Sequence, residues 1–106
     1  MPVTFLLNAP VITDYGLWSF KGPLSVSQAR DLAASAISAI GHHDTARFIE
    51  VLLETPIICS RRSIRMLPGE RALVFRLLSR RDEGELVSFA DLFDTPHEFG
   101  LLERTA

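Results

Sequence analysis

A buried central strand is the first structural requirement of this sequence. The run RALVFRLLSR, residues 71–80, places apolar side chains in direct succession, and a strand that is apolar on both faces lies inside a sheet. The preceding segment RRSIRML, residues 61–67, alternates polar and apolar side chains as a half-exposed strand does, and PGE, residues 68–70, is typical of a turn. Together the three segments predict a β-hairpin whose second strand is central in the sheet.

Other strands are predicted on either side of this hairpin. The segment VTFLLN, residues 3–8, is typical of a buried strand, and YGLWSFK, residues 15–21, of a strand with loose alternation. Near the other end, EFGLLER, residues 98–104, predicts a last strand. The short apolar segment ISAIG, residues 37–41, either closes a helix or forms a strand.

Helix signals lie between the strands. Ser25 followed by Gln28 forms a capping box, and residues 26–39 then have the apolar spacing of a helix. Two more helices are predicted: residues 44–54, opened by His43 or Asp44 and ended by Pro56, and residues 89–94, opened by a second capping box at Ser88 and Asp91 and stopped by Pro96.

Because strands and helices intermix, we expect an α/β protein of the mixed α+β kind. The prediction is a mixed β-sheet of about five strands flanked by helices. The 106 residues fit one domain, residues 1–106, and a chain this small would gain from a partner subunit.

Composition excludes several classes of protein. Apolar residues make up 47% of the chain, which is the composition of a globular and not a disordered protein. No apolar run reaches the roughly 18–20 residues that span a bilayer. The beginning MPVTFLLNAPV lacks a basic leader, so we expect a strand there and not a signal peptide. Cys59 is the single cysteine, which excludes an internal disulfide and favours the cytoplasm.

The charge is unevenly distributed. The net charge of −2 argues against a general DNA or RNA binder. Residues 61–81 nevertheless carry seven arginines and one acid, whereas residues 82–104 carry seven acids and one arginine. The two blocks either neutralise each other or, because the planar arginine fork suits phosphate, give a site a positive potential.

The pair His42 and His43 has three interpretations. A metal site lacks further ligands at suitable spacing, since Cys59 and His97 are the other obvious donors. In the second interpretation, the pair caps the helix that follows. A functional interpretation starts from position: a histidine at a helix N-terminus faces N–H groups that attract anions, and it can give a proton to a leaving oxygen.

Two loops are further candidates. In SRRDEGE, residues 79–85, the arginines either pair with the acids or bind phosphate, with Glu83 orienting Arg80 or contacting a ribose. In LLNAPVIT, residues 6–13, the turn after Asn8 is either an ordinary exit from a strand or a loop whose backbone and Asn8 amide contact a ligand.

These elements together resemble one small family, the viral ring nucleases. The resemblance covers nearly the whole chain and rests on five stretches in the same order: LLNAPVIT, SAIGHHDTARFIEVLL, IRMLPGERALVFRL, RRDEGE and EFGLLER. It implies an anti-CRISPR enzyme that destroys cyclic tetra-adenylate, the second messenger of type III CRISPR defence. The pattern IGH-x-x-T followed by R-x-x-E-G is its most specific part.

The resemblance assigns roles residue by residue. His42, which follows SAIG and precedes Thr45 by three, falls on the catalytic histidine, whereas His43 is a spectator. Val11 stands where some relatives have a serine that touches the ligand, so contacts there fall to the backbone or to nearby side chains. The catalytic set implied is His42, Arg80 and Glu83, and the substrate-binding set is Asn8, Ala9, Val11, Thr13, Gly41, Thr45, Arg81 and Gly84.

The implied reaction needs no metal and no cofactor. The ribose 2′-OH of the substrate attacks the adjacent phosphorus, His42 protonates the departing 5′ oxygen, and Arg80 stabilises the pentacoordinate charge. The products are linear di-adenylates ending in a 2′,3′-cyclic phosphate. Because the ring has a two-fold axis, the resemblance implies a homodimer with the ligand at its interface. The alternatives are a module that binds the ring without cutting it and a purely structural dimer module.

Overall fold

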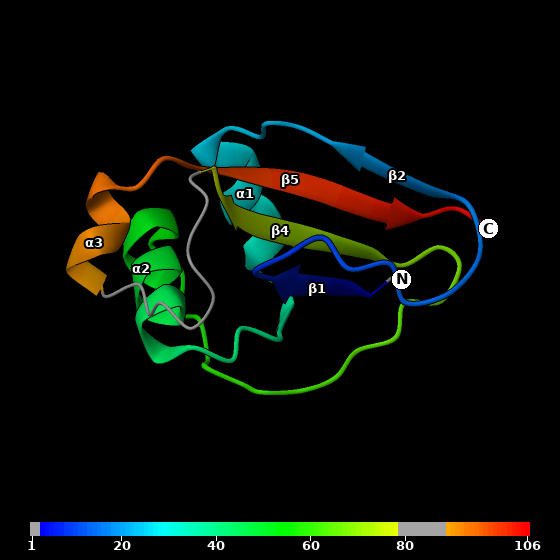
Figure 1. Cartoon of the computed structure of the whole chain (residues 1–106), viewed down its shortest axis with the longest axis horizontal. Coiled ribbons are helices and arrows are strands. Elements are labelled where there is room, and N and C mark those ends of the chain that lie inside the picture. Colours follow the sequence, from blue (N-terminus) through cyan, green and yellow to red (C-terminus); the bar gives the residue numbers. More distant parts are fainter. Residues whose placement is uncertain (1–2, 79–88) are drawn as a thin grey trace.

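The computed structural model describes residues 3–78 and 89–106, which form a small compact α+β domain with one five-stranded sheet and three helices (Figure 1). The predicted fold class is confirmed. In chain order the elements are β1 (Thr4–Leu7), β2 (Trp18–Lys21), α1 (Val26–Ala33), β3 (Ile37–Ser38), α2 (His43–Leu53), β4 (Arg71–Leu77), α3 (Phe89–Asp94) and β5 (His97–Arg104).

The sheet is mixed, with the strand order β2-β5-β4-β1-β3. β1 runs parallel to both β3 and β4, and β5 runs antiparallel to β4 and β2. β4 lies third in this order, and four of its side chains in succession are buried, residues 72–75. The prediction of a central strand in this segment is therefore confirmed.

The predicted hairpin is wrong. Residues 61–67 form no strand, and β4 pairs with β1 and β5 instead. Ile64 and Met66 pack on one face of the sheet, whereas Arg65 lies exposed between them. An extended segment laid across a sheet face alternates buried and exposed side chains just as a paired strand does. The alternation of polar and apolar residues in residues 61–67 therefore reflects packing on a face of the sheet and not pairing with an edge strand.

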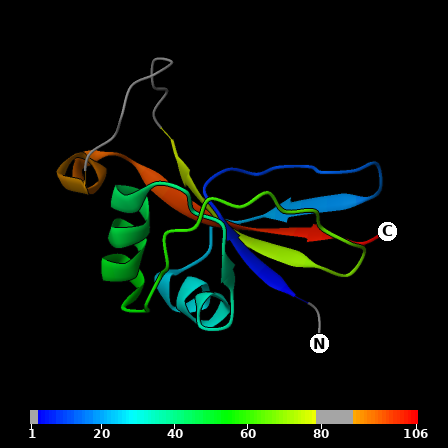
Figure 2. The same ribbon diagram turned by 90° about the horizontal axis from the view of Figure 1, so that it is seen from below.

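The two faces of the sheet are covered differently. Helices α1 and α2 lie on the same side of the sheet (Figure 2), and their buried side chains pack against one face, which includes Leu6, Leu73 and Phe75. The other face carries a smaller apolar cluster of Leu7, Met66, Ala72, Val74 and Leu102. Alternate residues of β1 and β4 thus serve the two layers, as the period of two requires.

The first predicted helix is too long. Ser25 and Gln28 do form the predicted capping box, with the Gln28 N–H donating to Ser25 Oγ at 3.1 Å. The helix nevertheless ends at Ala33, and Ile37–Ser38 joins the sheet as β3. The Ala39 N–H donates to the Leu6 carbonyl at 2.9 Å, so the backbone here takes its partners from the sheet. The strand alternative for this segment is the one that the structure adopts.

Of the other predicted elements, β1, α2 and β5 are confirmed to within a residue, whereas β2 begins three residues later than predicted and β4 ends at Leu77. α2 begins at His43 and ends at Leu53, where Glu54 takes the left-handed conformation with φ 52°. α3 spans the predicted residues, although the expected cap at Ser88 lies outside the described residues. No helix in the described part of the chain is long and apolar enough to cross a membrane.

Candidate functional site

A hollow opens where β1 and β3 end. Its volume is about 310 Å³. Ligands bind outside the carboxyl ends of parallel strands in many α/β proteins, because loops diverge there. The hollow, which we call the β1/β3 pocket, is lined by Leu7, Asn8, Ala9, Val11, Ala39, Arg62, Ser63 and Ile64.

The β1/β3 pocket combines apolar walls with few polar groups. Asn8, Arg62 and Ser63 supply the polar side chains, and the other lining side chains are apolar. Arg62 donates from Nε to Ser60 Oγ at 3.2 Å and pairs with no carboxylate among the described residues. An arginine without a paired acid at an apolar pocket suits an anionic ligand such as a phosphate.

His42 stands three residues after Ala39 of the pocket, at the start of α2. It is the N-cap residue, with extended backbone, and its carbonyl accepts from the Ala46 N–H at 3.0 Å. Its side chain makes no capping hydrogen bond. The ring nitrogen Nδ1 is buried and has no partner among the described residues. A buried polar atom without a partner is rare in folded proteins and points to a function or a missing ligand.

Gly41 fixes the approach of the chain to His42. The Arg61 guanidinium donates from Nε to the Gly41 carbonyl at 2.9 Å. A Cβ atom at position 41 would lie 2.7 Å from Arg61 Cγ, so a larger residue would displace this arginine. Gly41 therefore allows residues 60–62 to lie against the entrance of α2, where Ser60 also donates its N–H to the Ile40 carbonyl at 2.8 Å.

The family is decided by a match over most of the chain. A family model described as STIV B116-like matches residues 4–99. The chain belongs to the STIV B116-like family. A solved structure, B116 of Sulfolobus turreted icosahedral virus, shares the fold with a TM-score of 0.71 at 22% identity, over 96% of this chain and 99% of that one.

A bacterial protein is also similar to part of this chain. The protein described as "Uncharacterized protein YddF" of Bacillus subtilis (strain 168) is 36% identical over 67 residues. The match spans 63% of this chain and 62% of that protein, which is under two thirds of either length.

Within this STIV B116-like chain, the predicted site residues fall into four groups. Asn8, Ala9 and Val11 line the β1/β3 pocket together. Gly41, His42 and Thr45 lie at the entrance and in the first turn of α2. Thr13 belongs to a different hollow, which it lines with Ile12, Asp14 and Tyr15. The last group is Arg80, Arg81, Glu83 and Gly84, which lies outside the described residues.

His43 differs from His42 in its surroundings. It is the first residue of α2, and its side chain is exposed. The sequence predicted that His43 or Asp44 opens this helix, but the N-cap residue is His42. The described residues contain no group of three or more His, Cys, Asp or Glu side chains that could hold a metal ion.

Sequence reasoning missed one wall of the pocket. Arg62, Ser63 and Ile64 line it, yet residues 61–67 were expected to be a strand of a hairpin. The dense arginine block was a usable signal, since its first members, Arg61 and Arg62, find no acid among the described residues. The local sequence pattern did not predict that residues 61–67 cross one face of the sheet.

Proposed function

We propose that the protein is a metal-independent ring nuclease that cleaves cyclic tetra-adenylate into linear di-adenylates with 2′,3′-cyclic phosphate ends, and so switches off type III CRISPR signalling as an anti-CRISPR protein. The observation that carries the proposal is His42: its buried Nδ1 has no partner among the described residues, at the N-terminus of α2 and three residues from the β1/β3 pocket. The motif that contains His42 is also the most specific part of the ring nuclease resemblance.

The pocket chemistry supports an oligonucleotide ligand. Apolar walls from Leu7, Val11 and Ile64 suit the faces of a base, and the Arg62 guanidinium suits a phosphate. The N–H groups of the first turn of α2 favour negative charge at the same end of the site. A phosphodiester that lies between Arg62 and the start of α2 therefore meets positive potential from both sides.

The reaction assigns one proton transfer to His42. The ribose 2′-OH of the substrate loses its proton to water as it attacks phosphorus, and the attack expels the 5′ oxygen of the next nucleotide. Protonated His42 donates its proton to that oxygen as general acid. Arg80 stabilises the charge of the pentacoordinate phosphorus and Glu83 orients Arg80 or a ribose hydroxyl; both roles come from the ring nuclease resemblance.

The proposed ligand implies a proposed assembly. A ring of four identical nucleotides has a two-fold axis, and a C2 homodimer presents two His42 side chains to two opposite phosphates. The loop 8–17, which carries Asn8, Ala9 and Val11 of the pocket, also exposes Ile12 at 64% and Tyr15 at 101% of their surfaces. An exposed apolar surface beside the pocket is suited to contact a second copy of the chain.

Incubation with cyclic tetra-adenylate in EDTA, followed by chromatography of the products, tests the proposal. We expect the ring to disappear and a di-adenylate with a cyclic phosphate end to accumulate. An intact ring that binds tightly would identify a sequestering module in place of an enzyme. A ring that neither binds nor is cut, together with an unchanged melting temperature, would reject both functions.

A further inference from the structure

The two walls of the β1/β3 pocket come from segments that are far apart in the sequence. The loop 8–17, between β1 and β2, supplies Asn8, Ala9 and Val11, and residues 60–67, which we call the strap, supply Arg62, Ser63 and Ile64. Neither segment contains helix or strand. Regular hydrogen bonding within a helix or sheet therefore does not fix the separation of the two walls.

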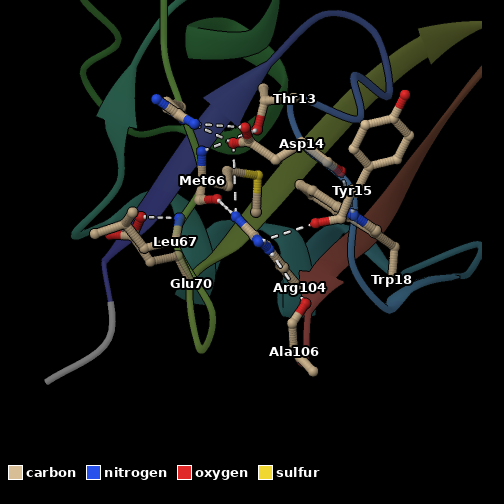
Figure 3. A network of polar contacts seen from close by, with 10 residues as sticks. Thr13, Asp14, Tyr15, Trp18, Met66, Leu67, Glu70, Arg104 and Ala106 are labelled. Atoms are coloured by element: carbon tan, nitrogen blue, oxygen red, sulfur yellow. Dashed lines mark hydrogen bonds and ion pairs between the residues drawn. The ribbon is translucent and has the colours of Figure 1, made fainter.

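Side-chain contacts join the two segments directly. The Arg65 guanidinium donates to Asp14 through two nearly parallel bonds, Nε to Oδ2 at 2.9 Å and Nη2 to Oδ1 at 2.7 Å. One residue further along the strap and one residue back along the loop, the Met66 N–H donates to Thr13 Oγ1 at 3.2 Å (Figure 3). Loop and strap are thus joined at adjacent residues, by a bidentate ion pair and a backbone contact.

Arg104 of β5 anchors this junction to the sheet. Its guanidinium donates from Nη1 to the Met66 carbonyl at 2.7 Å and from Nη2 to the Tyr15 carbonyl at 3.0 Å, so it holds one carbonyl from each segment (Figure 3). Nη1 also lies 3.6 Å from Asp14 Oδ2. The Arg104 side chain is only 13% exposed, and a buried fork with several acceptors has one preferred geometry.

The Arg65 side chain contrasts with Arg104 because it is 76% exposed. An ion pair that is so exposed to solvent contributes little to global stability. Its two-bond geometry still restricts how Asp14 and Arg65 can move relative to each other. The consequence of the pair therefore lies in the relative position of loop and strap more than in the folding of the domain.

We propose that Asp14 and Arg65 are positioning residues that, with Arg104 as their anchor, hold the loop and the strap at the separation in which the β1/β3 pocket accepts its ligand. The inference rests on the proposed function for the identity of that ligand, a cyclic oligoadenylate. Breaking the pair lets the two walls separate, which lowers the fraction of molecules with a formed pocket. The apparent affinity falls in proportion to that fraction.

We call the Asp14–Arg65 link between loop and strap the clamp. Hydrogen–deuterium exchange tests this clamp without any ligand. Asp14→Asn removes the charge of the loop partner, and Glu54→Gln is the matched control because Glu54 also pairs with an arginine, Arg30, at 3.0 Å. We expect faster exchange in both residues 8–17 and residues 60–67 for Asp14→Asn and unchanged exchange in these segments for Glu54→Gln. Unchanged exchange in Asp14→Asn overturns the clamp, whether or not the protein cuts the ring.

Steady-state cleavage and ring binding then test the positioning role. We expect KM to rise about tenfold in Asp14→Asn with kcat nearly unchanged, since formed pockets react normally. Arg65→Lys, which keeps the charge but loses the fork, should fall between wild type and Arg65→Ala. Faster exchange without any change in KM would overturn the positioning role. A wild type that neither binds nor cuts the ring would reject the proposed function, and the exchange result would still decide the clamp.

Discussion

His42 and His43 are neighbours with different surroundings, and the difference predicts different effects of substitution. Removing the His42 ring takes away the proposed acid, so His42→Ala should lower single-turnover cleavage of cyclic tetra-adenylate by about 10²–10⁴-fold and leave binding nearly unchanged. His43 is exposed and lies one residue away, which makes His43→Ala a matched control. Equal loss in both variants, or normal turnover in His42→Ala, would contradict the assignment.

Arg62 is the residue whose role the structure adds to the site. If its guanidinium binds a phosphate, Arg62→Ala should weaken ring binding by about 1.5–3 kcal/mol, the contribution of a charged hydrogen bond. Lys21→Ala removes the same charge from the exposed end of β2, at the opposite edge of the sheet from β3. Isothermal titration with both variants separates a local contact from net charge, because loss of affinity in both would indicate only long-range attraction.

Asp14 gives the protein a predictable response to acid. The hydrogen bond from Arg65 holds the pKa of the Asp14 carboxyl below its ordinary value. A lowered folded-state pKa stabilises the fold above the unfolded pKa of about 3.9, and this contribution is lost as the pH falls through the folded pKa. The difference in unfolding free energy between wild type and Asp14→Asn should therefore be constant from pH 7 to about 5 and shrink below about 4. A difference that grows in acid would have the wrong sign.

At the scale of single residues, the sequence pointed to one wall of the β1/β3 pocket and not to the other. Asn8, Ala9 and Val11 follow a buried strand directly, so their place at its carboxyl end could be inferred from local pattern. Arg62 reaches the same pocket from more than fifty positions away. Its position depends on where the strap crosses the sheet, which is a tertiary property that local spacing does not encode.

Among the elements, helix ends could be predicted from the sequence, whereas the pairing of strands could not. The capping box at Ser25 and the ending of α2 near Pro56 are local, and both could be predicted. The partner of β4 is not local. Residues 61–67 alternate like a strand, yet β1 and β5 occupy both edges of β4, so no edge remained for a hairpin. The arginines of this block that the structure describes therefore serve different surfaces: Arg61 bonds to Gly41, Arg65 to Asp14, Arg71 to Thr4 and Arg76 to Glu98.

The antiparallel pairing of β2 with β5 includes one close approach between a ring and a glycine. Gly100 lies under the Phe20 ring, and a Cβ atom there would be 2.6 Å from Phe20 Cε1 and 2.8 Å from Cζ. Gly100→Ala should therefore displace the ring and destabilise the domain by about 1 kcal/mol, the low end of the cost of overpacking, because the ring is 42% exposed and can move. Urea denaturation measures this change.

A second substitution distinguishes this clash from other effects of Gly100→Ala. In a Phe20→Ala background the ring is absent, so the added methyl group at position 100 meets far less. The two substitutions should then be strongly non-additive, as expected for residues in direct contact. Additive free energies would show that the ring is not what makes glycine necessary on β5.

For the whole molecule, the proposed ligand and the exposed apolar residues of the loop 8–17 lead to one expectation about assembly. Ile12 is 64% exposed on this loop, and Ile58 is 75% exposed in a segment that lines no part of the β1/β3 pocket. A surface that contacts a second copy tolerates no buried, unpaired charge, whereas a solvent-exposed position does. The same substitution at these two isoleucines therefore separates an interface from ordinary surface.

Ile12→Glu should shift the protein toward monomers in sedimentation equilibrium and weaken ring binding in parallel, whereas Ile58→Glu should change neither. In a His42→Ala background, titration calorimetry should give one ring for two chains, because a two-fold ligand at a C2 interface uses both pockets at once. Coupled loss of dimer and affinity follows from that geometry, since each monomer then offers half of the site. One ring per chain, or a monomeric Ile12→Glu variant with full affinity, would contradict a shared site and make each pocket independent.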